Sequence, residues 1–261
     1  MSVLFGMAVA RGEVDVQSTL AEIGIDDAKM PLTDVERRAK IADLLKARSG
    51  IYIEAAGETA EMKAGRPRRG QYHPGEHYYY NNWDFNTLGS ILSRVTGQTL
   101  HDHVLELGSR LGFQDYQEGH LFFMSASGSE HDQYVLYLSA RDLARVGQMM
   151  LRDGLDNAGQ SLLQADWIQE STKPYSVLTE RAPLDAYGYL WSIDEDRATV
   201  WATGWGGQYM LIDRANDLVI VVRNDTGRRL GEWLWLVALN NSTQGRMEQV
   251  TEMHAMLLRN E

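Results

Sequence analysis

The stretch HYYYNNWDFNTLGSILSRVTG, residues 77–97, joins a cluster of tyrosines and asparagines to a helical pattern. Its apolar residues recur at spacings of three and four, which predicts a helix from about residue 84 to Gly97. A tyrosine held directly before a rigid helix can present its hydroxyl to a cleft. The plainer interpretation is a polar turn in which Asn82 is the helix N-cap. The triplet Tyr80-Asn81-Asn82 alone is compatible with both.

The pattern outward from this stretch is helical first and strand-like later. Helical spacing predicts further helices near residues 3–12, 35–45, 99–107, 139–150 and 247–257, and a short one at Trp167. Residues 55–76 form a long polar loop. From about residue 186, short aromatic and β-branched runs separated by turn residues predict an antiparallel meander of three or four strands. This order indicates an α+β fold in one domain, residues 1–261.

Composition excludes several classes of function. The 261 residues carry a formal net charge of −11, which argues against a nucleic-acid partner because phosphate binding requires a basic face. There is no cysteine, so disulfides, thiolate catalysis and cysteine-ligated metals are excluded. No run approaches the roughly 18 apolar residues of a membrane helix. No signal peptide is expected either, because a basic leader and a cleavage pattern are missing, and the compartment stays open.

A second polar element, Ala202-Thr-Gly-Trp-Gly-Gly-Gln208, lies between two strand-like runs. Its three glycines allow the backbone to approach a ligand closely. Exposed N–H groups at such a strand edge could stabilise an oxyanion. The alternative is a glycine-rich bend in a twisted sheet, with no chemical role.

Together these elements resemble the serine β-lactamase and penicillin-binding-protein superfamily, most closely its class C-like and esterase branch, which includes nylon-oligomer hydrolases. YYNNWDFNTLGSILSRVTG resembles the Tyr-x-Asn box and the helix that follows it. DLLKARSGI, SARDLARVGQMMLRDG and ATGWGGQYMLIDRANDLVIVVRND are similar to three further segments of that superfamily, in the same order. The resemblance covers residues 2 to about 225.

The resemblance implies a mechanism in which a serine attacks a carbonyl and forms an acyl-enzyme. It gives Tyr80 the general acid/base role and Asn82 a hydrogen bond to the substrate or to a lysine. The N–H of Trp205, after Thr203-Gly204, would be one oxyanion donor. Ala202 replaces the Lys or His that often opens this box, which favours a small ester or amide over a β-lactam or peptidoglycan substrate. No cofactor is implied.

Trp83 and Trp205 could form an aromatic wall for an apolar acyl group. Trp83 follows the Tyr-x-Asn box directly, and Trp205 lies inside the glycine-rich element. Trp83 is compatible equally with a place in the core, so the residues leave its role open.

The nucleophile that the resemblance requires is missing. No serine in the 261 residues has a lysine three positions later. In the superfamily, Ser-x-x-Lys opens a helix that continues much like SVLFGMAVARGEVDV, which places Met1 at the lysine position. We therefore expect a chain that begins inside the catalytic helix. It should be inactive by the superfamily's mechanism, because a tyrosine of pKa near 10 needs a neighbouring cation to act as a base. The alternative is a pseudoenzyme that binds a ligand or partner without catalysis.

Two expectations concern partners and metals. The resemblance implies that strands preceding the catalytic helix pair with the C-terminal part of the sheet. Without them, residues 218–223 would form an exposed apolar edge prone to self-association. His101 and His103 lie two residues apart on a predicted helix and would point to different faces, so no metal site is expected.

Overall fold

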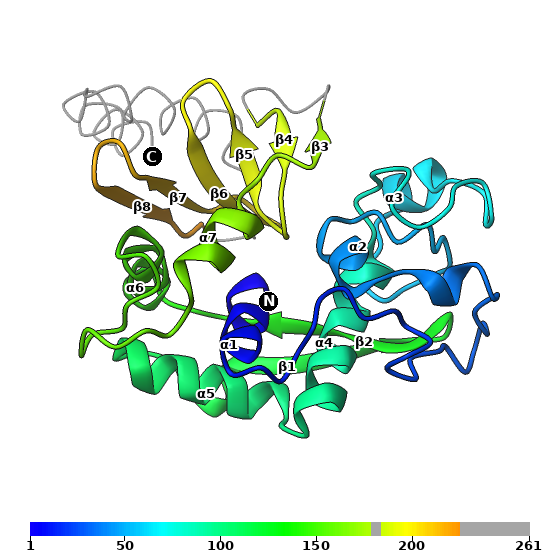
Figure 1. Ribbon diagram of the computed structural model, residues 1–261, viewed down its shortest axis with the longest axis horizontal. Coiled ribbons are helices and arrows are strands. Elements are labelled where there is room, and N and C mark those ends of the chain that lie inside the picture. Colours follow the sequence, from blue (N-terminus) through cyan, green and yellow to red (C-terminus); the bar gives the residue numbers. More distant parts are fainter. Residues whose placement is uncertain (179–183, 225–261) are drawn as a thin grey trace.

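The computed structural model describes residues 1–178 and 184–224, and within these it has an antiparallel sheet on one side and most of the helices on the other (Figure 1). The predicted α+β class is confirmed. The predicted helix at 247–257 and the rest of the proposed single domain beyond residue 224 lie outside the described residues. No helix in the described part of the chain is both long and apolar enough to cross a membrane.

The main sheet is a six-stranded antiparallel meander in which sequential strands are neighbours. Its strands are β3 (Ser176–Val177), β4 (Ala186–Tyr187), β5 (Ser192–Asp194), β6 (Thr199–Gly204), β7 (Gln208–Asp213) and β8 (Leu218–Val222). The predicted strands are present, and the sheet is longer than the three or four strands expected. Strand β3 lies before the predicted region, and the strand-like run that begins at residue 186 is divided into β4 and β5. Two residues, as in β3 and β4, are too few to show a two-residue period.

The helices are α1 (Ser2–Ala10), α2 (Ile41–Leu45), α3 (Ala60–Gly65), α4 (Asn82–Thr96), α5 (Leu100–Leu111), α6 (Ala140–Leu151) and α7 (Ala165–Ser171). Helix α4 ends at Gly97 in the left-handed conformation, as the sequence predicts. Thr99 then caps α5 and accepts a hydrogen bond from the N–H of Asp102. Helix α1 lies between the sheet and α5 (Figure 1), and residues 2–8 are all buried.

The predicted helix at 35–45 is interrupted. A capping box forms between Thr33 and Glu36, but it starts only a 3-10 helix, Glu36–Arg38. Ala39 is extended, and its carbonyl accepts a hydrogen bond from the N–H of Leu20 at 2.8 Å. The chain therefore exchanges one helical turn for a pairing with the segment near Leu20, and α2 begins two residues later.

A β-hairpin that the sequence pattern did not reveal packs on α4. It consists of β1 (Leu121–Ala126) and β2 (Ser129–Leu136), paired antiparallel. Three successive apolar residues of β1, Phe122, Phe123 and Met124, are all exposed. The alternation of apolar and polar residues that marks a half-buried strand is therefore absent from β1.

Candidate active site

The start of α4 is fixed by an asparagine cap. The Oδ1 of Asn81 accepts a hydrogen bond from the N–H of Trp83 at 3.2 Å, and its Nδ2 donates to the carbonyl of Ile51 at 2.7 Å. The plainer interpretation of the triplet therefore assigned the cap to the wrong residue, since Asn81 rather than Asn82 caps the helix. Tyr80 is the residue immediately before the cap, so the helix start determines its position.

Asn82 lies in the first turn of α4 and is almost fully buried. Its Nδ2 donates to the carbonyl of Ala56 at 3.3 Å, and Asn86, one turn later, donates to the same carbonyl at 3.1 Å. The two amides thus hold the loop around Ala56 against the helix. Asn82 has a structural partner, therefore, in addition to the role expected from the resemblance.

Tyr80 lies half-buried among three other aromatic residues. Its ring centroid is 4.6 Å from that of Phe85 in α4 and 6.5 Å from that of Tyr187 in β4, both edge-on. Tyr134 of β2 is a further neighbour, and burial first and the electrostatic effect of the nearby Tyr80 second raise the pKa of Tyr134 above its ordinary value. Tyr80 therefore lies where α4, the β1–β2 hairpin and the main sheet meet.

The first residue of the chain reaches the same region. A Cβ added to Gly89 of α4 would lie 3.1 Å from Tyr134 Cδ1 and 3.9 Å from Met1 Cε. The Nε1 of Trp191, between β4 and β5, donates to Ser2 Oγ at 3.2 Å. The start of α1 thus adjoins α4, the hairpin and the sheet. Met1, expected at the lysine position, lies beside the tyrosine that neighbours Tyr80.

The glycine-rich element is a hairpin loop at the end of β6. Thr203 pairs with Tyr209, Gly204 pairs with Gln208, and the turn uses left-handed backbone at Gly206 and Gly207 (φ 77° and 78°). Tyr80 reaches the sheet at β4, two strands from β6. At roughly 4.8 Å between strands, this separates the two elements by about 10 Å across the sheet.

Asn224, just after β8, fastens that loop, a role that no pattern in the sequence indicated. Its Nδ2 donates to the carbonyl of Gly207 at 2.9 Å. Gln208 Nε2 donates in turn to the carbonyl of Asn224 at 2.8 Å. The backbone from Thr203 to Gly207 is therefore held from two sides. Trp205 at its tip remains 79% exposed and free to contact a ligand.

Trp83 does not contribute to an aromatic wall. It is fully buried, and its Nε1 donates to Asp27 Oδ2 at 3.0 Å. Asp27 also accepts from Ser129 Oγ at 2.5 Å, so this carboxylate joins α4 to the hairpin. Of the two interpretations that the sequence left open, burial supports the core for Trp83. Trp205 alone of the pair is exposed.

A buried carboxyl group, that of Asp84, also holds the segment that carries Tyr80. Asp84 Oδ1 accepts from Ser49 Oγ at 2.5 Å and from Asn81 Nδ2 at 3.0 Å. Asp84 is fully buried, and burial raises its pKa well above the ordinary value despite these hydrogen bonds. This contact attaches the segment after α2 to the cap of α4. The position of Asp84, three residues after the capping asparagine, is the sequence signal that could have indicated it.

Most of the basic residues in the loop before Tyr80 are ion-paired. Lys63 lies 2.8 Å from Glu54, Arg66 lies 2.6 Å from Glu58, and Arg69 lies 2.7 Å from Glu36. These pairs neutralise most of the positive charge locally. The loop is thus better suited to holding its own structure than to attracting an anion.

The described residues contain no group of three or more metal-ligating side chains. His103 is buried, and its Nε2 lies 2.9 Å from Thr96 Oγ1. The ring of His101 instead packs near Phe123 of the hairpin. The two histidines therefore face different surroundings.

Comparisons with known proteins identify the family and the fold. A sequence profile described as Beta-lactamase matches residues 2–228. A search of curated proteins found no match. Among solved structures, one from Bacillus anthracis named for 6-aminohexanoate-dimer hydrolase aligns with a TM-score of 0.64 at 18% identity, covering 99% of this chain and 72% of that one.

Two penicillin-binding proteins align similarly. The protein from Bacillus halodurans has a TM-score of 0.60 at 18% identity, over 91% of this chain and 81% of that one. A homologue from Caulobacter crescentus has a TM-score of 0.59 at 16% identity, over 84% and 72%. Identities this low establish the fold alone, whereas the profile covers most of the sequence. The chain belongs to the beta-lactamase family.

Proposed function

We propose that this protein is a serine hydrolase that cleaves an ester or amide through an acyl-enzyme, with Tyr80 as general acid/base. The family is one of hydrolases. The observation that supports this role most directly is the position of Tyr80, half-buried beside Phe85 and Tyr187 and two residues before Asn82. Asn82 would orient the substrate or a lysine, and the N–H of Trp205 would be one oxyanion donor.

The substrate should be small and need no cationic contact. Ala202, on β6, stands where relatives often have Lys or His, so this position offers no charge to a substrate carboxylate. The exposed indole of Trp205 offers an apolar surface to an acyl group. A neutral ester or amide fits this combination better than an anionic β-lactam.

The 261 residues supply the proposed acid/base and one oxyanion donor, but no Ser-x-x-Lys nucleophile. Tyr80 also needs a cation to lower its pKa from near 10. Tyr134 cannot provide one, since its hydroxyl is neutral and its pKa is raised further by burial. We therefore propose that this chain by itself forms no acyl-enzyme.

The first experiment is the intact mass and N-terminal sequence of the native protein from its source. A mass above 29.5 kDa, with Ser-x-x-Lys ahead of Ser2, should accompany burst hydrolysis of 4-nitrophenyl butyrate and labelling by a fluorophosphonate. In that protein Tyr80→Phe should lower kcat at least 100-fold, by loss of general acid/base catalysis. Tyr79→Phe is the matched control, because Tyr79 donates to the carbonyl of Met62 and should be dispensable for chemistry.

A second candidate function is ligand or partner binding without catalysis, which the missing Ser-x-x-Lys favours. A native mass equal to residues 1–261 would support it. The 261-residue chain should then bind without turnover. A hydrolytic burst from this chain that Tyr80→Phe abolishes would contradict the proposal that it is inactive.

A further inference from the structure

The interruption of the predicted helix at Ala39 brings two basic side chains together. In a continuous helix, residues two positions apart point to different faces. Ala39 is instead extended (ψ 135°), and so is Lys40 (ψ 157°). In extended backbone, residues two positions apart lie on the same side. Arg38 and Lys40 accordingly line one cavity, of about 410 Å³.

The other walls of this cavity, the Arg38 pocket, come from three further parts of the chain. They are the residue before the 3-10 helix, the first turn of α2, and the turn that precedes the tyrosine-rich segment. The lining residues are Val35, Arg38, Lys40, Asp43, His73 and Pro74. The volume falls within the range of small-molecule sites, roughly 300–1,000 Å³. Tyr80 does not line the Arg38 pocket, so binding there would be separate from the proposed catalysis.

Backbone contacts hold both sides of the Arg38 pocket. On one side, the N–H of Ala21 donates to the carbonyl of Arg37 at 3.0 Å. On the other side, the N–H of Gly75 donates to the carbonyl of Arg48 at 2.8 Å. Gly50 lets this second wall approach closely, because a Cβ there would lie 2.8 Å from a backbone oxygen of the turn. The walls are therefore fixed by the fold rather than by a ligand.

Two side chains that line the Arg38 pocket have no partner within the described residues. The guanidinium of Arg38 makes neither an ion pair nor a hydrogen bond there, and the imidazole of His73 makes no hydrogen bond. The ammonium of Lys40 donates to Gln17 Oε1 at 3.1 Å, which leaves two of its three donor protons available. The pocket therefore presents several hydrogen-bond donors that the fold itself does not use.

The lining of the Arg38 pocket carries a net positive charge. Asp43 is its one carboxylate, and Asp43 Oδ2 accepts a hydrogen bond from the N–H of Lys40 at 2.9 Å. Two cations and this carboxylate give the lining a formal charge of +1, with His73 neutral. The nearby Arg37 adds little, because it is paired with Asp26 at 2.5 Å. This positive site lies on a chain whose net charge is −11.

We propose that the Arg38 pocket binds a small organic monocarboxylate that carries an apolar body. The carboxylate would accept two parallel hydrogen bonds from the Arg38 guanidinium and a third from Lys40. Its single charge balances that of the lining, whereas Asp43 would repel the second charge of a phosphate dianion. The apolar body would lie against Val35 and Pro74, the two apolar side chains of the lining.

The test is a titration of the isotopically labelled 261-residue chain with hexanoate, followed by NMR through the amide shifts of Lys40, Asp43 and Gly75. The cationic groups are exposed, so we expect a Kd on the order of a few millimolar. Hexylamine has the same apolar body with the opposite charge and should not bind. Acetate lacks most of that body and should bind about fivefold more weakly. Inorganic phosphate should also bind more weakly than hexanoate.

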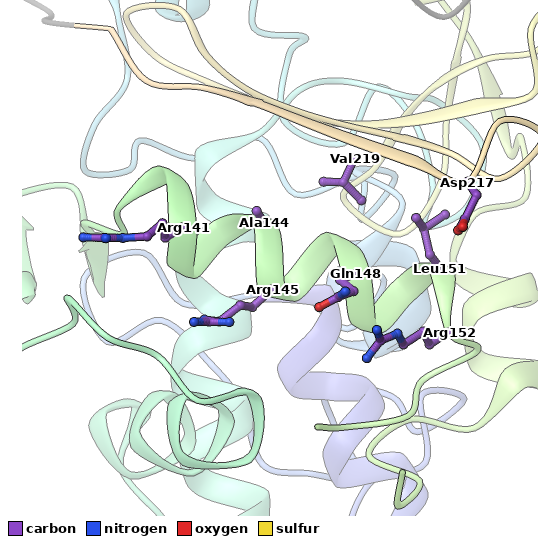
Figure 2. Close-up of a pocket in the computed structure, with 8 residues that line it drawn as sticks. All are labelled: Arg141, Ala144, Arg145, Gln148, Leu151, Arg152, Asp217 and Val219. Atoms are coloured by element: carbon purple, nitrogen blue, oxygen red, sulfur yellow. The ribbon is translucent and has the colours of Figure 1, made fainter. Parts of the chain in front are cut away.

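Two substitutions should change the Kd for hexanoate in opposite directions. Arg38→Gln should raise it about tenfold, by loss of the two charge-assisted hydrogen bonds. Asp43→Asn should lower it about threefold, because it removes a repelling charge while its oxygen can still accept from the N–H of Lys40. The matched control is Arg152→Gln, which removes an exposed arginine from a separate cavity between α6 and β8 (Figure 2) and should leave the Kd unchanged.

The melting temperature of each variant is recorded, and Lys40→Gln, which should raise the Kd about threefold, replaces Arg38→Gln if that variant does not fold. No saturating shift of the three amides by about 50 mM hexanoate would overturn the proposal. Binding of hexylamine or phosphate as tight as that of hexanoate would overturn it as well. So would an Arg38→Gln variant whose Kd equals that of the Arg152→Gln control.

Discussion

Replacing Asp27 by asparagine tests whether one buried carboxylate holds the Tyr80 segment to the rest of the fold. Asp27 is fully buried. Its Oδ2 accepts from Ser129 Oγ at 2.5 Å and from Trp83 Nε1 at 3.0 Å. Its Oδ1 accepts from three backbone N–H groups, those of Lys29, Met30 and Glu130, at 3.0–3.3 Å. Every contact therefore uses an oxygen as acceptor.

Asparagine has only one acceptor oxygen and directs N–H groups from the other position. If the amide nitrogen takes the Oδ2 position, the indole N–H of Trp83 faces another donor, whereas the Ser129 hydroxyl can turn and accept. If it takes the Oδ1 position, the backbone N–H groups face it instead. At least one buried donor is therefore unsatisfied, which costs about 1–3 kcal/mol of the free energy of unfolding. At about 2–4 °C per kcal/mol for chains of this size, the melting temperature should drop by roughly 6 °C.

Urea unfolding followed by circular dichroism at several pH values measures this loss. Burial acts to raise the pKa of Asp27, but its hydrogen bonds, Ser129 first, outweigh burial and hold that pKa below the ordinary 3.8. A lowered folded pKa means that the carboxylate stabilises the fold above pH 3.8 and loses this effect as pH falls through the folded value. The deficit of Asp27→Asn should therefore shrink in acid.

The matched control is Asp34→Asn. Its side chain is 93% exposed and 3.7 Å from Arg37, so the change should be below about 0.5 kcal/mol. If Asp27→Asn cost no more than this control, or if its deficit were the same at every pH, the reasoning about Asp27 would be refuted.

Three further changes test other parts of the structure. Asp84→Asn should remove a pH dependence of stability. Burial raises the pKa of Asp84, so the native protein should lose up to about 1.4 kcal/mol of stability per pH unit above 3.8. The melting temperature of the variant should therefore change less with pH than that of the native protein, and identical profiles would contradict this. Gly147→Ala would place a Cβ 2.6 Å from Val219 Cγ1, so it should destabilise by about 1–2 kcal/mol in urea, whereas Gly65→Ala, with nothing within 4 Å, should be neutral or stabilising. Trp205→Ala should change the free energy of unfolding by less than about 0.5 kcal/mol, and a larger loss would mean that the indole is part of the core.

Long amphipathic elements could be predicted from the sequence, because their period repeats several times. Helices α4, α5 and α6 have the predicted positions, and the glycine that ends α4 adopts the left-handed conformation. The strand-like runs from β6 to β8 were also visible, since β-branched residues gather between turn signals. For these segments, local pattern and tertiary environment favour the same structure.

Elements that depend on distant partners were not predictable. The hairpin β1–β2 exposes three apolar side chains in succession, so its sequence lacks the strand period. The break at Ala39 comes from a hydrogen bond to Leu20, nineteen positions earlier, as counted from their numbers. The partners of Trp83 also lie far away in the sequence, at Asp27, and thus its buried place could not be distinguished beforehand from a place in the cleft.

Three side chains hold the start of α4, next to Tyr80, through partners outside the helix that would carry the nucleophile. Asp27 joins the start of α4 to the hairpin, Asp84 joins it to Ser49, and Asn82 joins it to Ala56. None of these partners belongs to α1. These three contacts to the proposed acid/base segment would therefore remain without the nucleophile. Loss of Ser-x-x-Lys would abolish the proposed acylation and still leave Tyr80 and Trp205 in place. For this reason the same fold is compatible with both proposed functions, hydrolysis and binding without catalysis. Activity, rather than folding, is the property that separates them.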